Sequence, residues 1–242
     1  RTSSLKVGVG ESVITPEGPF QMDGFARSQM STGTHDDLHA RSLVIEDGKG
    51  TAVVMMTVAL VAVPRDDFAV IRKGITDKTG IPSNNILISA THTHSGPRLR
   101  PGNISAGGAK IYNEARQSQE SIDAYHKFFI DRCIESAVKA WESRVPGRIG
   151  IAPTTVLELG RNRRRLLYGG LHPDPEVGLI KVENAAGKLM GVAFIYGCHP
   201  SGLDWKNTLF TEDWPYYAIQ GIKKTFGDQV WAAFYQSCAG DI

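Results

Sequence analysis

The hydrophobic positions of the chain follow two periods, and the shorter period marks the expected β-strands. Apolar and β-branched residues alternate or cluster between turn residues, a pattern that indicates strands. The segments with this pattern are residues 6–13, 40–46, 51–63, 85–90, 148–157, 177–183, 189–198 and 229–235. A glycine-containing loop at residues 47–50 and a turn at residues 184–188 each join two of these strands, so two antiparallel hairpins are expected.

The longer period, with apolar residues three to four positions apart, predicts helices. They are one helix between Pro64 and Gly80, and helices at residues 120–143 and 214–226. Asp66 and Asp67 are candidate N-caps of the first helix, and Pro146-Gly147 is expected to end the second. The first helix lies between two predicted strands, which is the order of a parallel crossover unit. The sequence therefore predicts an α/β protein with mixed, partly parallel β-sheets layered with helices.

Composition places the chain among ordinary globular proteins. Its 242 residues include 27 Lys and Arg against 25 Asp and Glu, and 41% are hydrophobic, which fits one large domain or one large and one small domain. The net charge of +2 is too small to favour nucleic acid as a partner. The longest apolar stretch, residues 52–64, is shorter than the ~20 residues of a membrane helix, so no transmembrane segment is expected. The 3 cysteines lack C-x-x-C spacing and indicate neither a disulfide framework nor a thiolate zinc site.

Histidines at strand ends are the strongest candidates for chemistry. His92 and His94 follow the predicted strand at residues 85–90, and in extended backbone two such side chains face the same way. Because sites of α/β proteins lie at carboxyl ends of strands, the two imidazoles can form a zinc site there. The alternative is two polar residues with incidental roles. His199 closes another apolar strand, and although a lone histidine is more often structural, its placement matches that of His92.

Four further segments are candidates for metal binding, substrate binding or a site loop. His35 to His39 concentrates imidazoles and carboxylates, although a solvated turn is favoured for Asp36 and Asp37. In the basic run at residues 161–165, at most one or two arginines are expected to hold a carbonyl oxygen or a carboxylate, while the others are solvated. Small residues at 236–242 suit close approach of backbone to a ligand. The long polar stretch at residues 97–117 is a candidate site loop.

Taken in order, these segments resemble the neutral/alkaline ceramidase family of zinc amidohydrolases. Thr-His-Thr-His-Ser-Gly-Pro at residues 91–97 is the most specific match. Met-Asp-Gly-Phe-Ala at residues 22–26 resembles the family's M-x-G-[YF]-A, and residues 33–41 resemble its G-x-H-x-x-L-x-A-R. Other matching segments are residues 162–163, 174–177, 198–200, 212–218 and 239–241. The resemblance thus runs across nearly the whole chain.

The resemblance implies roles for individual residues. His92 and His199 would be zinc ligands, His94 would polarise or protonate the reacting amide, and Arg163 would hold its carbonyl oxygen. The candidates for substrate binding within the matched segments are Asp23, His35, Gly240 and Asp241. Family members also use a Glu and a Tyr from further along the chain as metal ligands. Residues 1–242 are therefore expected to be the N-terminal portion of one catalytic domain, with a C-terminal segment or second chain supplying those ligands.

The activity that the resemblance implies is hydrolysis of a C–N amide bond by a metal-activated water. Charges at Asp23, at Asp36-Asp37 and at residues 98–100 depart from the family pattern and favour a smaller or more polar amide than ceramide. One alternative is self-processing after Ile242, which would create a new N-terminal nucleophile. Another is a non-catalytic metal- or ligand-binding protein on the same scaffold. Export to the periplasm or outside the cell is a weak expectation from the resemblance.

Overall fold

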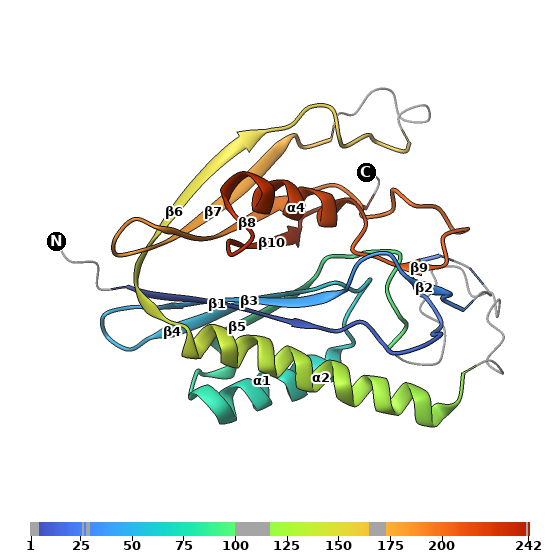
Figure 1. The fold of residues 1–242 in the computed structure, drawn as a ribbon, viewed down its shortest axis with the longest axis horizontal. Coiled ribbons are helices and arrows are strands. Elements are labelled where there is room, and N and C mark those ends of the chain that lie inside the picture. The colour runs from blue at the N-terminus through green and yellow to red at the C-terminus, as the bar shows by residue number, and fades with distance from the viewer. Residues whose placement is uncertain (1–4, 26, 28–29, 100–116, 165–172, 241) are drawn as a thin grey trace.

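The fold is described by a computed structural model that covers residues 5–25, 27, 30–99, 117–164, 173–240 and 242. Its central feature is an 8-stranded sheet with the strand order β10-β8-β7-β6-β1-β3-β4-β5. Two short strands, β2 (Gly33–Thr34) and β9 (Leu209–Phe210), pair in parallel and form a separate two-stranded sheet. Helices cover the outer faces of the large sheet, which is folded over on itself (Figure 1).

One half of the sheet packs on two helices. It contains β1 (Lys6–Val13), β3 (His39–Glu46), β4 (Ala52–Val58) and β5 (Ile86–Ala90). The first three strands are antiparallel, whereas β4 and β5 are parallel and joined through α1 (Arg65–Thr79) and the short 3₁₀ helix Ser83–Asn85. The long helix α2 (Gln119–Glu142) lies across β1 and β3. This half therefore contains both the expected hairpin and the expected crossover.

Glycines on β1 allow α2 to approach the sheet closely. A Cβ atom on Gly8 would lie 2.0 Å from the carbonyl oxygen of Ala140, and one on Gly10 would lie 2.4 Å from that of Ser136. No side chain fits at such distances, so α2 rests directly on the strand. Val7, which points to the other face of β1, is fully buried between the two halves of the sheet.

The other half of the sheet is covered by one helix, α4 (Trp214–Phe226). Its strands are β6 (Val145–Thr155), β7 (Glu176–Asn184), β8 (Leu189–Tyr196) and β10 (Trp231–Gln236). β7 and β8 form the second predicted hairpin, and β10 runs parallel to β8. Because β10 also contacts β4 and β5, the two halves face each other around a shared apolar core. The order of layers is helix, sheet, sheet, helix, which confirms the predicted α/β class (Figure 1).

Several element boundaries differ from the sequence prediction. α1 is preceded by Pro64, and Asp66 and Asp67 lie within its first turn, so neither is the N-cap; Gly80 ends it in the left-handed conformation as expected. Pro146-Gly147 lies inside β6, and α2 ends earlier, at Glu142. The predicted strand at residues 51–63 stops at Val58, because the backbone beyond it turns to contact the segment after β5. Most of the long stretch at residues 97–117 lies outside the described residues.

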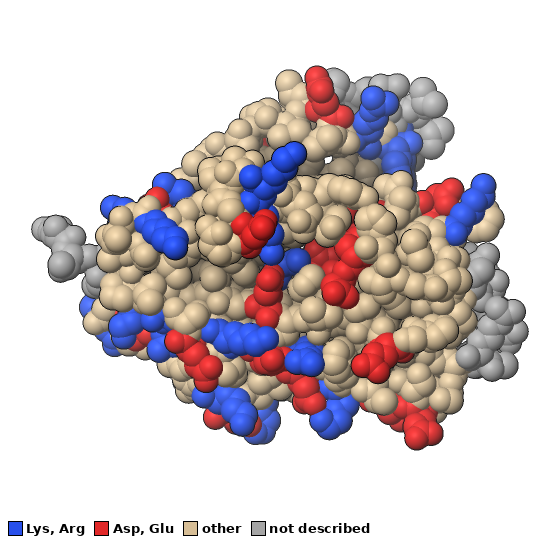
Figure 2. Space-filling view, in the orientation of Figure 1, with Lys and Arg blue, Asp and Glu red and all other residues tan. Residues whose placement is uncertain are grey.

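On the face shown in Figure 2, basic and acidic side chains lie near one another, with uncharged surface between them and a group of acidic side chains near the centre. This agrees with the small net charge of +2. Among the described residues, no helix is both long and apolar enough to cross a membrane.

Candidate metal centre

Three imidazoles meet at the carboxyl ends of β5 and β8. His92 and His94 follow β5, and His199 follows β8. One potential ligand nitrogen from each ring lies within 4.8 Å of the others. The ring centroids are 4.6 Å apart for His92 and His199, 4.7 Å for His94 and His199, and 5.2 Å for His92 and His94. The structure therefore brings together His92, His94 and His199, the histidines to which the sequence analysis gave metal-binding or catalytic roles.

The backbone that presents His92 is not extended, as the sequence analysis assumed. β5 ends at Ala90, and His92 has a φ of 68°, an uncommon conformation for a residue with a side chain. The backbone N–H of His92 donates to the carbonyl of Leu60 at 2.9 Å, and its Nδ1 lies 2.6 Å from the carbonyl oxygen of Val61. The apolar segment after β4 thus holds the His92 backbone and side chain instead of continuing the strand.

Two of the three rings are oriented as metal ligands usually are. His92 Nδ1 faces the carbonyl oxygen of Val61 at 2.6 Å, and His199 Nδ1 faces that of Ala239 at 2.9 Å. A carbonyl only accepts, so each Nδ1 carries the proton and each Nε2 keeps a lone pair for a cation. Arg163 Nη2 also lies 3.1 Å from His199 Nδ1, but an N–H that donates to Ala239 cannot accept from a guanidinium. The shorter contact with Ala239 decides the tautomer.

His94 differs from the other two histidines. Its Nδ1 is buried and has no hydrogen-bond partner among the described residues, and its Nε2 lies 2.8 Å from Nε2 of His199. Burial, with His199, His92 and nearby arginines adding to the effect, lowers the pKa of His94 to about 3. Burial likewise lowers the pKa of His199, although its contact with Ala239 opposes the shift. Both shifts favour the neutral imidazole in His94 and His199, which is the form that binds metal ions.

The segment Thr211 to Asp213 connects the two loops that carry the histidines. Thr93 Oγ1 donates to the carbonyl of Thr211 at 2.8 Å, which ties the segment to the His92–His94 loop. The buried Asp213 carboxylate accepts from the backbone N–H groups of Gly202 and Leu203, both at 3.0 Å, in the loop after His199. Asp213 is also the N-cap of α4 and has a φ of 65°. A helix start therefore fixes the loop after His199.

We expect Asp213→Ala to weaken zinc binding by roughly tenfold or more, because the loop after His199 loses its anchor. Zinc affinity of the full-length protein, measured by competition with a chromogenic chelator, checks this expectation. Asp204→Ala is the matched control, since Asp204 lies in the same loop and, within the described part of the chain, its exposed side chain accepts only from the backbone N–H of Lys206 at 2.8 Å. Equal affinities in the two variants would contradict the anchoring role.

The segment after β1 packs directly against His94. Gly24 has a φ of 96°, and a Cβ atom there would lie 2.6 Å from both Cα and Cγ of His94. The Phe25 ring meets the His94 ring edge-on, with centroids 4.6 Å apart. The buried Arg27 donates to the backbone carbonyls of His94 and Asn207. Close backbone approach, which only glycine permits, thus positions the His94 ring.

The other predicted site residues are placed in different surroundings. The exposed Arg163 donates through Nη2 to the carbonyl of Gly240 at 2.6 Å, next to His199. Asp23 accepts from the backbone N–H of Gly24 and lies 3.6 Å from Nη2 of Arg98. Asp241 lies outside the described residues.

His35 lies in a separate cluster of polar and aromatic side chains. Its Nδ1 contacts Asp36 at 2.7 Å, and its Nε2 contacts the Tyr217 hydroxyl at 3.2 Å. The interpretation of Asp36 as a solvated turn residue is wrong: its carboxylate is buried and accepts from the Thr211 hydroxyl and the backbone N–H of Glu212. Asp37 is exposed, as expected.

A cavity of about 300 Å³ opens beside two of the imidazoles. Its lining residues are Ser89, Ala90, His92, His199, Gln236, Ser237, Ala239 and Gly240. They come from the carboxyl ends of β5 and β10 and from the residues that follow β5, β8 and β10. Of the predicted substrate-binding residues, Gly240 is part of this lining, whereas Asp23 and His35 are not.

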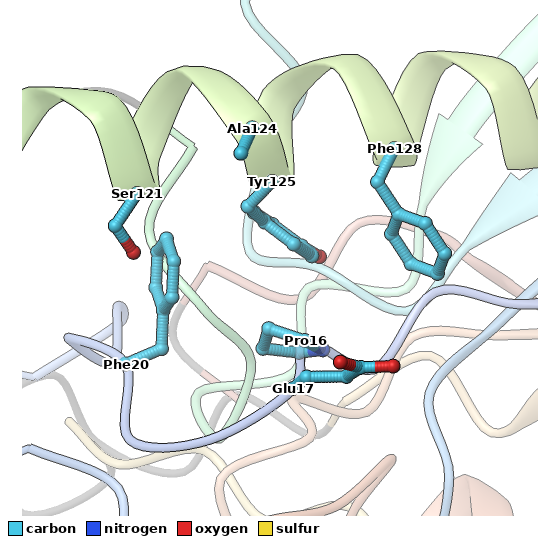
Figure 3. Close-up of a pocket in the computed structure, with 7 residues that line it drawn as sticks. All are labelled: Pro16, Glu17, Phe20, Ser121, Ala124, Tyr125 and Phe128. Atoms are coloured by element: carbon cyan, nitrogen blue, oxygen red, sulfur yellow. The ribbon is translucent and has the colours of Figure 1, made fainter.

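A second cavity, of about 340 Å³, lies between the start of α2 and the segment after β1. In Figure 3 the rings of Phe20, Tyr125 and Phe128 lie between the helix and Pro16 and Glu17. The Tyr125 hydroxyl donates to the carbonyl of Ile14, and burial raises its pKa well above the ordinary value. Among the described residues, the lining of this second cavity contains no imidazole or thiol.

Fold and site define a layered α/β protein with a cluster of three imidazoles at its strand ends. The chain belongs to the neutral/alkaline non-lysosomal ceramidase family, because the sequence model of that family's N-terminal region matches residues 5–242. This match confirms the resemblance found in the sequence motifs.

Individual relatives agree with the family assignment. The chain is 26% identical over 266 residues to neutral ceramidase A of Dictyostelium discoideum, covering 99% of this chain and 36% of that protein. It is 25% identical over 264 residues to the neutral ceramidase of Mycobacterium tuberculosis, covering 98% and 40%. The crystal structure of neutral ceramidase from Pseudomonas aeruginosa has a similar fold, with a TM-score of 0.83, 23% identity, and coverage of 100% of this chain and 39% of that chain. The chain spans two fifths or less of the length of these relatives.

Proposed function

We propose that this chain carries part of the active site of a zinc-dependent hydrolase that cleaves a C–N amide bond, as the ceramidase names of its relatives suggest. The observation that carries the proposal is the convergence of His92 and His199, each with its Nδ1 proton directed at a backbone carbonyl. Imidazoles held in this way fit a zinc ion, which prefers nitrogen ligands that are oriented by a second contact. His92 and His199 would hold the ion through Nε2.

Zinc, when bound, supplies a Lewis acid that polarises a carbonyl and lowers the pKa of bound water towards 7. The remaining chemistry belongs to side chains of this chain. His94 has no second contact at Nδ1 among the described residues, so we assign it to hydrogen bonding with the reacting amide and not to the ion. Arg163, held beside His199 by Gly240, would hold the carbonyl oxygen through its guanidinium.

We further propose that residues 1–242 are the N-terminal portion of one catalytic domain. Its relatives are more than twice as long as the matched region, which supports this division. A structural zinc site has four ligands, and a catalytic site has three from protein. Further ligands would come from a C-terminal segment or a second chain. The amide substrate is a small molecule, and export from the cell stays a prediction of the resemblance.

Metal removal from the full-length protein tests the proposed function. We expect a strong chelator to abolish amide hydrolysis and added zinc to restore it, because zinc supplies the Lewis acid. Hydrolysis of N-dodecanoylsphingosine and zinc content by elemental analysis are the two measurements. Chelator-insensitive hydrolysis together with a new N-terminus after Ile242 would favour the self-processed nucleophile instead. Stoichiometric zinc without hydrolysis of any amide would favour a non-catalytic binding protein.

A further inference from the structure

Thr211 joins three parts of the chain that are distant in sequence. It is buried and lies between β9 and α4. Its backbone N–H donates to the carbonyl of Ser95 at 3.2 Å, and its carbonyl accepts from Thr93 Oγ1 at 2.8 Å. Its hydroxyl contacts the carboxylate of Asp36 and the backbone N–H of Asp213. Every polar group of Thr211 therefore has a partner.

The direction of the two hydroxyl contacts follows from the chemistry of the groups. A hydroxyl has one proton to donate, whereas a backbone N–H can only donate. The Thr211 hydroxyl must therefore accept from Asp213, at 2.9 Å, and donate its own proton to Asp36. The carboxylate of Asp36 thus keeps an oxygen lone pair of Thr211 directed at the backbone of Asp213.

Three contacts hold the Asp36 side chain in place. This side chain is only 3% exposed, and one of its oxygens accepts from the backbone N–H of Glu212 at 2.8 Å. The other oxygen accepts from Thr211 and lies 2.7 Å from Nδ1 of His35. Because both oxygens are used, the carboxylate cannot turn without leaving a buried donor unpaired, which is costly.

The contact between Thr211 and Asp213 supports an uncommon backbone conformation. Asp213 has a φ of 65°, which few residues with a side chain adopt and which persists only where surrounding contacts hold it. In this conformation the Asp213 carboxylate accepts from the backbone N–H groups of Gly202 and Leu203. The Thr211 hydroxyl therefore helps to place the carboxylate that anchors the loop after His199.

The backbone of Thr211 holds the other histidine loop at the same time. Its contacts with residues 93 and 95 lie on both sides of His94. The backbone N–H of His94 in turn donates to the carbonyl of Pro200 at 3.0 Å, next to His199. The two loops are thus fixed to each other both directly and through Thr211.

Asp36 itself is not placed to touch a bound molecule. It is absent from the lining of the cavity beside the imidazoles, and its oxygens are occupied by the contacts described above. Any role of Asp36 in the site must therefore act through Thr211.

We propose that Asp36 and Thr211 are positioning residues of the metal centre. Through the Thr211 hydroxyl, the carboxylate of Asp36 holds Asp213, and Asp213 holds the loop of His199 against that of His94. Contacts behind metal ligands orient them, and their loss commonly weakens metal binding by about 10–100-fold. The consequence for zinc rests on the proposed function, whereas the hold on the loop does not.

Hydrogen exchange of the zinc-free full-length protein tests the hold on the loop. Thr211→Val keeps the shape of the side chain but removes its hydroxyl, so amides in peptides covering residues 201–206 should exchange about tenfold faster, as for one lost buried hydrogen bond. Thr211→Ser keeps the hydroxyl and should stay within about threefold of the wild type. Thr225→Val is the matched control and should leave this exchange unchanged, since it removes a hydroxyl that donates to Gly221 at 2.8 Å in the last turn of α4.

Asp36→Asn tests the other end of the same contact. An amide has one oxygen where a carboxylate has two, so it cannot keep the contacts with both Thr211 and Glu212. We expect exchange at residues 201–206 to rise as in Thr211→Val, and the double variant to stay within about threefold of either single variant, because both act through one hydrogen bond. Asp37→Asn, at the neighbouring exposed carboxylate, is the control and should have no effect.

Zinc affinity, measured by competition with a chromogenic chelator, tests the consequence for the metal centre. Thr211→Val and Asp36→Asn should bind zinc about tenfold more weakly, whereas Thr211→Ser should stay within about threefold of the wild type. At saturating zinc, the KM for N-dodecanoylsphingosine should change by less than about twofold in these variants, because neither residue lines the cavity.

Each other outcome has a definite meaning. Equal exchange in Thr211→Val and the wild type, or an equal rise in Thr211→Val and Thr211→Ser, would overturn the positioning role. Faster exchange at residues 201–206 without weaker zinc binding would overturn its connection to the metal centre. A wild type that binds no zinc would contradict the proposed function, while the exchange rates would still decide whether Asp36 and Thr211 hold the loop. If Thr211→Val does not fold, Asp36→Asn and Asp37→Asn decide the question by the same criteria.

Discussion

His92→Ala is expected to release zinc and reduce amide hydrolysis by at least about a thousandfold, because the proposed zinc ion would lose a ligand whose orientation is fixed by Val61. His199→Ala should behave in the same way, since its ring is held by Ala239. Zinc content by elemental analysis and kcat/KM on N-dodecanoylsphingosine are measured on the same preparations of the full-length protein.

His94→Ala provides the matched comparison for both variants. It removes an imidazole from the same cluster, but one whose Nδ1 has no second contact among the described residues. We expect this variant to retain close to one zinc ion per chain and still lose about a hundredfold or more in kcat/KM, as for loss of a group that hydrogen-bonds the transition state. Loss of zinc from His94→Ala to the extent seen with His92→Ala would show that all three histidines are ligands.

Glu212→Ala is expected to lower the free energy of unfolding by about 3 kcal/mol, because it leaves a buried guanidinium without its closest partner. Glu212 Oε1 accepts from Arg41 Nη1 at 2.6 Å, and both side chains are buried. The backbone N–H of His39 donates to the same oxygen at 3.0 Å, and Nδ1 of the His39 ring lies 3.2 Å from it. Urea denaturation of the full-length protein measures the change.

Glu11→Ala is the control for this effect. Glu11 contacts the same guanidinium at 3.3 Å, but its side chain is 37% exposed. An ion pair of that exposure contributes less than about 1 kcal/mol. Similar losses of stability in the two variants would contradict the special importance of the buried contact.

The same carboxyl group links stability to pH. Burial acts to raise the pKa of Glu212, but Arg41 and His39 outweigh it, so that the pKa lies below its ordinary value of 4.5. Folding therefore favours the ionised carboxylate, and its stabilising contribution is present above pH 4.5 and lost as the pH falls below it towards the folded-state pKa. The difference in unfolding free energy between the wild type and Glu212→Gln should shrink over that range. A difference that stays constant below pH 4.5 would contradict this linkage.

Local sequence signals were sufficient to predict most of the helices and strands. The helix at residues 214–226 was placed correctly because an apolar face at helical spacing coincides with clear ends, and both hairpins follow from short turns between apolar strands. The strand at residues 51–63 was too long, since an apolar run has the same composition whether it pairs in a sheet or supports a neighbouring loop. The contacts of Leu60 and Val61 with His92 decide between these two uses, and they depend on tertiary structure.

The site was predictable only in part. The meeting of His92 and His199 follows from their equivalent places after two strands, and the roles of both stay predictions. The anchoring of the site loops by Thr211 and Asp213 could not be read from spacing, because Thr93 and Thr211 are 118 positions apart. Asp213 did have a local signal, as an acidic residue before a helix with Pro215 in its first turn, but that signal marks a helix start and not a site.

The most direct test of the account is a crystal structure of the full-length protein with data collected at the zinc absorption edge. We predict one anomalous peak within about 2.0–2.1 Å of Nε2 of both His92 and His199, with Nδ1 of each ring still directed at its backbone carbonyl. A zinc-replete crystal with no anomalous peak between these two imidazoles, or with its peak at other residues, would contradict the proposed metal centre and the hydrolase mechanism built on it.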